Sequence, residues 1–217
     1  MIQSQHDFKN RESLAKSLAA QVAAKLSRCI TLQGAATLAV SGGTTPLAFF
    51  EQLSLQQITW NKVSVTLVDE RQVPEDHVRS NAGLVKKNLL VNLAQAAKFV
   101  PLYQNPKAEK LNLDVVVLGM GNDGHTASFF PGGDNLAEAL APDSKKSIVE
   151  MQAPAAGEPR LTFSLAKLLA ASSLFLHIEG QKKRDVLAKA NAGSDVMAMP
   201  IRAVLQSANP LQVYWCP

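Results

Sequence analysis

Apolar residues recur along the chain in two spacings that alternate with each other. The first spacing is typical of one face of an amphipathic helix, and it runs through residues 10–28 in steps of four at Leu14, Leu18, Val22 and Leu26. The second is a short, nearly continuous apolar run, which is typical of a strand buried on both faces of a parallel sheet. It predicts buried strands at residues 37–40, 63–68 and 114–118, and we expect further strands at residues 147–151, 174–178 and 211–215.

Helix signals fall between these runs. Pro46 fits the first position of a helix, Ser80 or Asn81 can cap a helix that reaches residue 90, and residues 179–184 end one strand and begin another helix. Residues 200–207 form a last helix, and residues 160–164 alternate as in an edge strand. This order predicts an α/β fold with a doubly wound, mainly parallel sheet flanked by helices, in a single domain spanning residues 1–217.

The composition of the chain limits the kinds of partner that we expect it to bind. The chain has 217 residues, of which 47% are hydrophobic and 18% charged, as expected for a globular protein with a sizeable core. No apolar run reaches the roughly 18 residues of a spanning helix, and the N-terminal residues lack an apolar signal segment, so we expect a cytoplasmic protein without a membrane partner. The net charge is +4 and 6% of residues are aromatic, which favours a small anionic ligand over nucleic acid.

The cysteines indicate neither a disulfide framework nor a metal site. Cys29 and Cys216 lie near opposite ends of the chain, with no CxxC motif and no histidine at metal-ligand spacing. We therefore interpret them as reduced thiols. His77 is interpreted as a solvated residue, and His177, inside a strand, as a structural histidine rather than a ligand.

The strand at residues 114–118 leads into a glycine-rich segment that carries the clearest candidate chemistry. Gly119, Gly121 and Gly124 let the backbone approach a ligand closely, and they surround Asp123 and His125. In open α/β sheets ligands bind at the carboxyl ends of the strands, so a histidine there, beside an aspartate, is a candidate general base. The same letters match the dinucleotide pattern GxGxxG, which we disfavour because the proline at position 131 leaves no room for a full crossover helix.

The other strand ends add polar groups to the same edge. The turn at residues 41–46 (Ser-Gly-Gly-Thr-Thr-Pro) offers a row of N–H groups and a helix N-terminus, which suits a phosphate, although an ordinary tight turn is the alternative. Asp69 could accept a hydrogen bond from a substrate hydroxyl, and Arg71 could bind a phosphate. Alternatively, both could belong to a surface ion pair. Lys183 and Arg184 could reach an anion or simply start a solvated helix.

Taken together, the segments 41–46, 68–74 and 119–132 resemble the 6-phosphogluconolactonase family. The order matches, the resemblance continues through residues 159–162 and 180–183, and Asp-Gly-His-Thr-Ala-Ser-Phe-Phe-Pro-Gly is highly specific. Two positions depart from the family pattern. Asn122 is a residue typical of the related glucosamine-6-phosphate deaminases. Lactonases often carry an aspartate shortly after the tryptophan, whereas Trp215 is followed by Cys216.

The resemblance implies hydrolysis of 6-phospho-D-glucono-1,5-lactone to 6-phosphogluconate in the oxidative pentose phosphate pathway, without a metal or other cofactor, by a monomer or homodimer. His125 would be the general base, Asp69 or Asp123 would hold its imidazole or a sugar hydroxyl, and N–H groups near Gly121 and Gly124 would stabilise the oxyanion. The expected substrate-binding residues are Ser41, Gly42, Gly43, Thr44, Arg71, Asn81, Arg160 and Lys183, with Gly121 and Gly124. The alternatives are a glucosamine-6-phosphate deaminase or isomerase and a non-catalytic module that binds sugar phosphates.

Overall fold

The structure is a computed structural model that describes residues 2–103, 105–154 and 156–217. Its strands are β1 (Ile2–Asp7), β2 (Ala36–Val40), β3 (Val63–Leu67), β4 (Asp69–Arg71), β5 (Lys98–Phe99), β6 (Val115–Leu118), β7 (Ile148–Met151), β8 (Arg160–Phe163), β9 (Ser173–Glu179) and β10 (Leu211–Cys216). Its α-helices are α1 (Arg11–Gln33), α2 (Leu47–Ser54), α3 (Asn81–Asn88), α4 (Leu136–Leu140), α5 (Leu165–Leu169), α6 (Gln181–Asn191) and α7 (Ile201–Leu205). Short 3-10 helices occupy Trp60–Lys62, Asn92–Ala96 and Ala108–Lys110.

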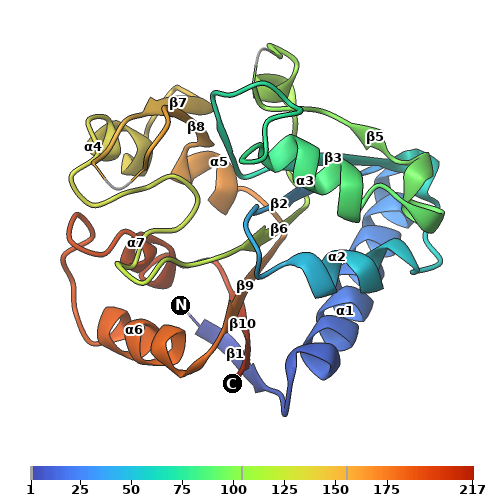
Figure 1. The fold of residues 1–217 in the computed structure, drawn as a ribbon, viewed down its shortest axis with the longest axis horizontal. Coiled ribbons are helices and arrows are strands. Elements are labelled where there is room, and N and C mark those ends of the chain that lie inside the picture. Colours follow the sequence, from blue (N-terminus) through green and yellow to red (C-terminus); the bar gives the residue numbers. More distant parts are fainter. Residues whose placement is uncertain (1, 104, 155) are drawn as a thin grey trace.

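Seven strands form one parallel sheet in the order β1-β10-β9-β6-β2-β3-β5 (Figure 1). From β2 the chain moves outward through β3 to β5, and then returns to the other side of β2 with β6, β9 and β10. The sheet is therefore doubly wound, as the sequence predicted. The direction of winding reverses between β2 and β6, and such switch points leave a crevice at the carboxyl ends of the strands.

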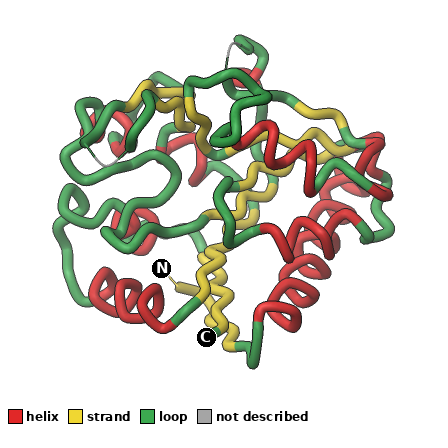
Figure 2. Tube along the Cα trace, viewed as in Figure 1, coloured by secondary structure: helices red, strands yellow, loops and turns green. Residues whose placement is uncertain are grey.

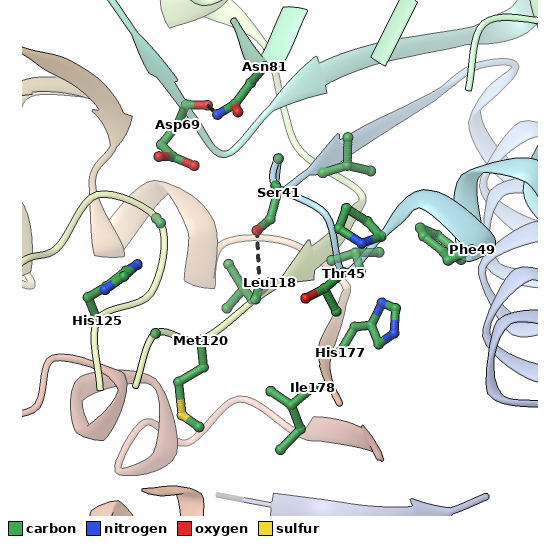
Figure 3. Close-up of a pocket in the computed structure, with 18 of the residues that line it drawn as sticks. Ser41, Thr45, Phe49, Asp69, Asn81, Leu118, Met120, His125, His177 and Ile178 are labelled. Carbon is green, nitrogen blue, oxygen red and sulfur yellow. Dashed lines mark hydrogen bonds between the residues drawn. The ribbon is translucent and has the colours of Figure 1, made fainter. Parts of the chain in front are cut away.

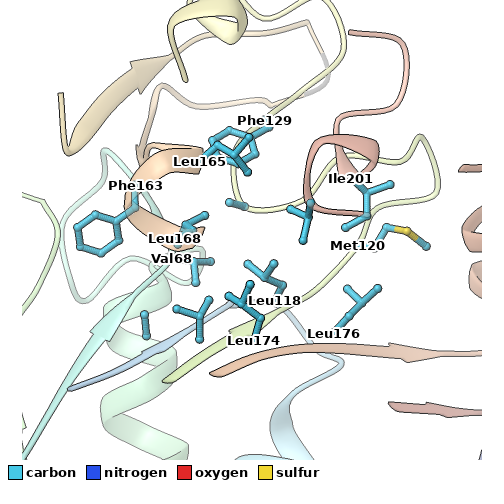
Figure 4. Close-up of a cluster of buried hydrophobic side chains, with 14 of the residues drawn as sticks. Val68, Leu118, Met120, Phe129, Phe163, Leu165, Leu168, Leu174, Leu176 and Ile201 are labelled. Carbon is cyan, nitrogen blue, oxygen red and sulfur yellow. The ribbon is translucent and has the colours of Figure 1, made fainter. Parts of the chain in front are cut away.

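The sheet is covered on both faces, and alternate residues of β6 face different clusters. Val115 and Val117 pack in a cluster with α1, α2 and α3. Val116 and Leu118 pack in a second cluster with α5, α6 and α7, part of which is drawn in Figure 4. Burying each such side chain stabilises the fold by about 1.5–3 kcal/mol. A strand buried on both faces needs apolar residues at every position, which explains the unbroken run in the sequence.

Helix α1 confirms the predicted amphipathic helix and extends it to Gln33. The four residues at steps of four are fully buried. The side chain of Asn10 caps the first turn by accepting a hydrogen bond from the N–H of Ser13 at 2.9 Å. Gly34 ends the helix with φ of +84°, a left-handed conformation that favours glycine. No described helix is long and apolar enough to cross a membrane.

A second, antiparallel sheet with the order β4-β8-β7 corrects two expectations. Residues 160–164 were expected to form an edge strand, but β8 is the central strand of this sheet because β4 and β7 pair with both of its edges. Residues 69–71 were expected in a loop after a strand, but Asp69 pairs with Thr162 and Arg71 with Arg160. β1, which pairs with β10 at the edge of the main sheet, was not anticipated.

Candidate active site

The carboxyl ends of β2 and β6 are joined by Ser41. Its N–H donates to the carbonyl of Val117 at 3.0 Å, and its hydroxyl oxygen accepts a hydrogen bond from the N–H of Gly119 at 2.9 Å. Beyond this bridge lies a cavity of about 280 Å³, drawn in Figure 3. The cavity therefore occupies the switch point of the sheet, where ligands of this fold class bind.

Most of the residues singled out in the sequence line this one cavity. They are Ser41, Gly42, Gly43, Asp69, Arg71, Asn81, Gly121, His125, Arg160 and Lys183. Thr44, Asp123 and Gly124 are not part of the lining, whereas Thr45 of the predicted phosphate-binding turn is. Phe130, His177 and Glu179 also line the cavity, although the sequence did not assign them to a site. Thr44 is exposed, and its neighbour Thr45 faces inward.

His125 and Asp123 form a close pair at one side of the cavity. Asp123 Oδ1 lies 2.6 Å from His125 Nδ1 and also accepts the backbone N–H of His125 at 3.1 Å. The hydrogen bond from His125 lowers the pKa of Asp123 to about 2, so the carboxylate is ionised at neutral pH. An ionised carboxylate only accepts hydrogen bonds, so Nδ1 carries the proton of the neutral ring. Nε2 is then the nitrogen that can take up a proton.

The segment that carries this pair has no regular element between β6 and α4 (Figure 2). Its shape depends on glycine. A Cβ at Gly121 would overlap the imidazole of His125 and the carboxylate of Asp123, and Gly124 has φ of +83° with Met199 packed against it. The N–H of Gly121 donates to the carbonyl of His125, and the N–H of Gly124 donates to the carbonyl of Gly121. Both N–H groups expected near an oxyanion are thus engaged within the loop.

The turn after β2 presents unpaired donors at the cavity. Within the part of the chain that the structure describes, the backbone N–H groups of Gly42, Gly43, Thr44 and Thr45 have no protein acceptor. Gly43 has φ of +90°, and Pro46 is the N-cap of α2. Unpaired N–H groups before a helix N-terminus attract an anion. Gly42 is required here because a Cβ would overlap the amide of Asn81.

Asp69 and the arginines form a buried polar network on the β4–β8 side. Asp69 Oδ2 accepts a hydrogen bond from Ser128 at 2.6 Å and lies 3.6 Å from Arg160. Arg71 donates to Asn81 Oδ1 at 3.0 Å, and Asn81 in turn donates to the carbonyl of Asp69 at 2.9 Å. Asp69 is therefore not the carboxylate beside the imidazole. The surface ion pair considered for this segment does not form, since Asp69 is buried.

Glu70, which lies between Asp69 and Arg71 in the chain, stabilises the fold. It is buried and accepts the backbone N–H groups of Asn81 at 2.8 Å, Ala82 at 2.7 Å and Arg71 at 2.7 Å. Burial raises the pKa of this carboxyl, and the three hydrogen bonds oppose the shift. Ser80 caps the same helix by accepting the N–H of Gly83, as the sequence allowed.

Lys183 reaches the cavity from the start of α6, and its ammonium donates to the carbonyl of Met120. Burial lowers the pKa of Lys183, and the nearby carboxylate of Asp123 opposes this change. Arg184 points elsewhere: it lies over the ring of Trp215 and pairs with Asp7 at 2.9 Å. Of the two basic residues considered at this helix start, only Lys183 lines the cavity.

Three nitrogens of cavity residues are buried without a hydrogen-bond partner among the described residues: Arg71 Nε, Arg160 Nε and His177 Nδ1. Buried polar atoms are almost always paired, so unpaired polar atoms on the residues around one cavity indicate a site for a polar ligand. The guanidinium of Arg160 lies 5.3 Å from the ring of Phe130, which packs against His125 at a centroid distance of 4.5 Å. No group of three or more described His, Cys, Asp or Glu side chains could hold a metal ion.

A doubly wound sheet with a site at its switch point occurs in enzymes of many kinds, so the class of this protein is taken from comparison with known proteins. The model of the family "Glucosamine-6-phosphate isomerases/6-phosphogluconolactonase" matches residues 9–215. The chain belongs to this family.

Several relatives that cover nearly the whole chain are named 6-phosphogluconolactonase. A 6-phosphogluconolactonase of Rhizobium meliloti (strain 1021) is 51% identical over 232 aligned positions, with 100% of both chains covered. One from Pseudomonas aeruginosa is 43% identical and covers 94% of this chain and 90% of its own. The crystal structure of a 6-phosphogluconolactonase from Shewanella baltica OS155 superposes with a TM-score of 0.94 at 39% identity, covering 99% of this chain and 97% of the other. A monomeric glucosamine-6-phosphate deaminase, at 17% identity and a TM-score of 0.78, shares the fold.

Proposed function

We propose that the chain is a 6-phosphogluconolactonase, which hydrolyses 6-phospho-D-glucono-1,5-lactone to 6-phosphogluconate in the oxidative pentose phosphate pathway. The observation that carries the proposal is the pairing of His125 with an ionised Asp123 at the edge of a cavity whose other walls supply unpaired N–H and guanidinium donors. Relatives of that name at up to 51% identity support the choice of substrate.

His125 is the general base in this proposal. Asp123 holds the ring through Nδ1, so Nε2 removes a proton from a water molecule as its oxygen attacks the lactone carbonyl. The tetrahedral intermediate then expels the ring oxygen, which takes the proton back from the imidazolium and becomes the free hydroxyl. The carboxylic acid formed in this step then loses its own proton to solvent and becomes the carboxylate of the product. No redox partner is needed, and the water supplies both the new oxygen and the proton.

The phosphate is held by the turn of residues 41–45. Its four unpaired N–H groups and the N-terminus of α2 attract a dianion. Lys183 adds a positive charge from α6, and Arg71 and Arg160 add two from the small sheet. Holding the phosphate away from the reacting carbon orients the lactone, and orientation is a large part of catalysis.

Asp69 and Asn81 complete the binding site rather than the proton transfer. Asp69 is fixed by Ser128 and Arg160, and Asn81 by Arg71, so both present polar atoms from a rigid wall. Ring hydroxyls of the lactone are the matching partners, because a carboxylate can accept a hydrogen bond from a hydroxyl and an amide can either donate to one or accept from one.

The test is hydrolysis of freshly generated 6-phosphoglucono-1,5-lactone, corrected for spontaneous opening. A rate well above the uncatalysed rate, lost in His125→Asn, supports the proposal. Ammonia release from glucosamine-6-phosphate would instead indicate a deaminase. Binding of 6-phosphogluconate without any acceleration of lactone opening would indicate a non-catalytic module.

A further inference from the structure

His177 carries a buried nitrogen that the proposed reaction leaves unexplained. The residue lies in β9 with a relative exposure of 2%, and Nδ1 has no hydrogen-bond partner among the described residues. Its ring lines the cavity. Leaving a buried polar atom unpaired is unfavourable, so a partner supplied by the ligand would explain why this histidine is present.

The other ring nitrogen fixes the protonation of the ring. His177 Nε2 lies 3.1 Å from Glu179 Oε1, and Arg11 pairs with Glu179 Oε2 at 2.6 Å. Burial acts to raise the pKa of Glu179, but the hydrogen bonds from His177 and Arg11 outweigh it and leave the pKa below its ordinary value. The ionised carboxylate accepts only, so Nε2 carries the hydrogen of the neutral ring. Nδ1 then carries the lone pair of the ring, and this ring lines the cavity.

The part of the cavity near His177 is the end expected to hold the phosphate. Figure 3 shows His177 beside Thr45, with His125 on the opposite side of the cavity. Thr45 belongs to the turn with unpaired N–H groups, and Phe49 of α2 meets the His177 ring edge-on at 6.2 Å. A substrate that spans the cavity thus has its carbonyl near one histidine and its phosphate near the other.

We propose that His177 is a positioning residue for the substrate phosphate, and that Nδ1 and one phosphate oxygen share a single proton in the complex. This inference rests on the proposed lactonase function. A phosphate monoester is a dianion at pH 8, since its second pKa is about 6. Neither it nor the neutral ring brings a proton to the contact. The proton therefore comes from solvent, and Glu179 stabilises the resulting imidazolium.

The groups packed around His177 leave it as the proton acceptor. The charged group that contacts His177 is Glu179 in its own strand, which Arg11 at the start of α1 pairs in turn, and α2 contributes the uncharged Phe49. Lys183 of α6 lines the same cavity. β10 contributes the titratable side chains of Tyr214 and Cys216. Burial raises the pKa of both of these side chains, so both are neutral at pH 8.

The test is calorimetric titration of the full chain with 6-phosphogluconate at pH 8 in two buffers of different ionisation enthalpy. The parent protein should take up close to one proton for each ligand bound. His177→Asn should bind within about fivefold of the parent without proton uptake, because its amide can donate to the dianion directly. His177→Leu should bind at least ~10-fold more weakly, whereas binding of unphosphorylated gluconate stays unchanged.

Two histidine variants serve as controls. His125→Asn, across the cavity, and His6→Asn, which packs on Tyr214 outside the cavity lining, should both keep the uptake. Uptake that persists in His177→Asn, or that disappears in His125→Asn, overturns the assignment.

Kinetics separate this inference from the lactonase proposal. His177→Leu should raise KM at least ~10-fold and leave kcat within about threefold; a fall in kcat at constant KM contradicts a phosphate contact. Histidine-dependent uptake in a protein that does not open the lactone would refute the lactonase activity alone. Lactone hydrolysis that is indifferent to both His177 variants would refute the role of His177 alone.

Discussion

Gly121 lies directly against the imidazole of His125, so closely that a Cβ at position 121 would overlap the ring nitrogen Nδ1. The same Cβ would overlap the carboxylate of Asp123, which bonds that nitrogen. A glycine at this position is thus a condition for the His125–Asp123 pair to form in the observed geometry.

Gly121→Ala should therefore separate the pair. We expect kcat for lactone opening to fall by ~10²-fold or more, since misplacement of a base by about 1 Å can cost that factor. Overpacking should also lower the free energy of unfolding by about 1–3 kcal/mol. Gly119→Ala is the matched control for stability, because its Cβ would meet Ser41 at an ordinary 3.8 Å. Equal kcat in Gly121→Ala and the parent would show that the pair does not need this geometry.

His125→Asn tests the base itself. The amide cannot take a proton from water, so kcat should fall by ~10²–10⁴-fold. Affinity for 6-phosphogluconate should remain nearly unchanged, because the proposed phosphate-binding turn of residues 41–45 lies at the other end of the cavity. Lactone hydrolysis with freshly made substrate and calorimetry with the product give the two quantities. Full activity of the variant would remove His125 as the base.

Asp123→Asn tests the electrostatics of the pair through stability. The folded-state pKa of about 2 lies below the ordinary 3.8, so the ionised carboxylate stabilises the folded state. That contribution is fully present above about pH 4 and is lost as pH falls through about 2. Urea unfolding should give a higher free energy of unfolding for the parent than for the variant at pH 5, and this difference should narrow steadily towards pH 2. A difference that is independent of pH would mean that Asp123 acts through packing.

Lys183→Ala should mainly weaken substrate binding. Its ammonium lies at the cavity, so we expect KM to rise about 10-fold or more with little change in kcat. Lys182→Ala removes an exposed lysine from the preceding position and should leave KM unchanged. Arg71→Ala should also raise KM. If KM is unchanged in both Lys183→Ala and Arg71→Ala, the phosphate is bound elsewhere.

The fold was predictable where burial leaves a local signature. The apolar run of β6 and the four-residue steps of α1 both reflect contacts made by every turn or pleat of the element. β1 left no such signature, because it is an edge strand whose residues alternate between exposed and partly buried and include one aliphatic side chain, Ile2. β4 has three charged or polar residues and becomes a strand only by pairing with β8, far along the chain.

The sequence predicted most of the residues that line the cavity, but it did not predict which of these residues contact one another. The glycines and the strand ends located His125, Arg71 and the turn after β2. Sequence left open whether Asp69 or Asp123 holds the imidazole, and only the folded loop brings Asp123 to it. His177 was interpreted as structural because its neighbours in the strand are apolar. Its burial agrees, but its ring also lines a cavity that α2 and the turn before it help to form, and no local pattern connects these elements to β9.

Ser41→Ala tests whether the switch point is held open by a single side chain. The Ser41 hydroxyl is the acceptor for the N–H of Gly119, and so it ties the end of β2 to the start of the glycine loop. Its loss leaves that N–H without its protein partner, and because the site is half-buried, water replaces part of the bond. We expect the free energy of unfolding to fall by about 1 kcal/mol and Tm by about 2–4 °C.

Ser41→Ala should affect the kinetics of lactone hydrolysis more strongly than it affects the free energy of unfolding. Loss of the hydrogen bond between Ser41 and Gly119 should displace both the turn of residues 41–45 and the loop that carries His125. KM should therefore rise and kcat should fall together. Ser41→Thr keeps the oxygen and should restore most of both parameters. If the threonine variant behaves like the alanine variant, the hydroxyl bond to Gly119 is not what aligns the two loops.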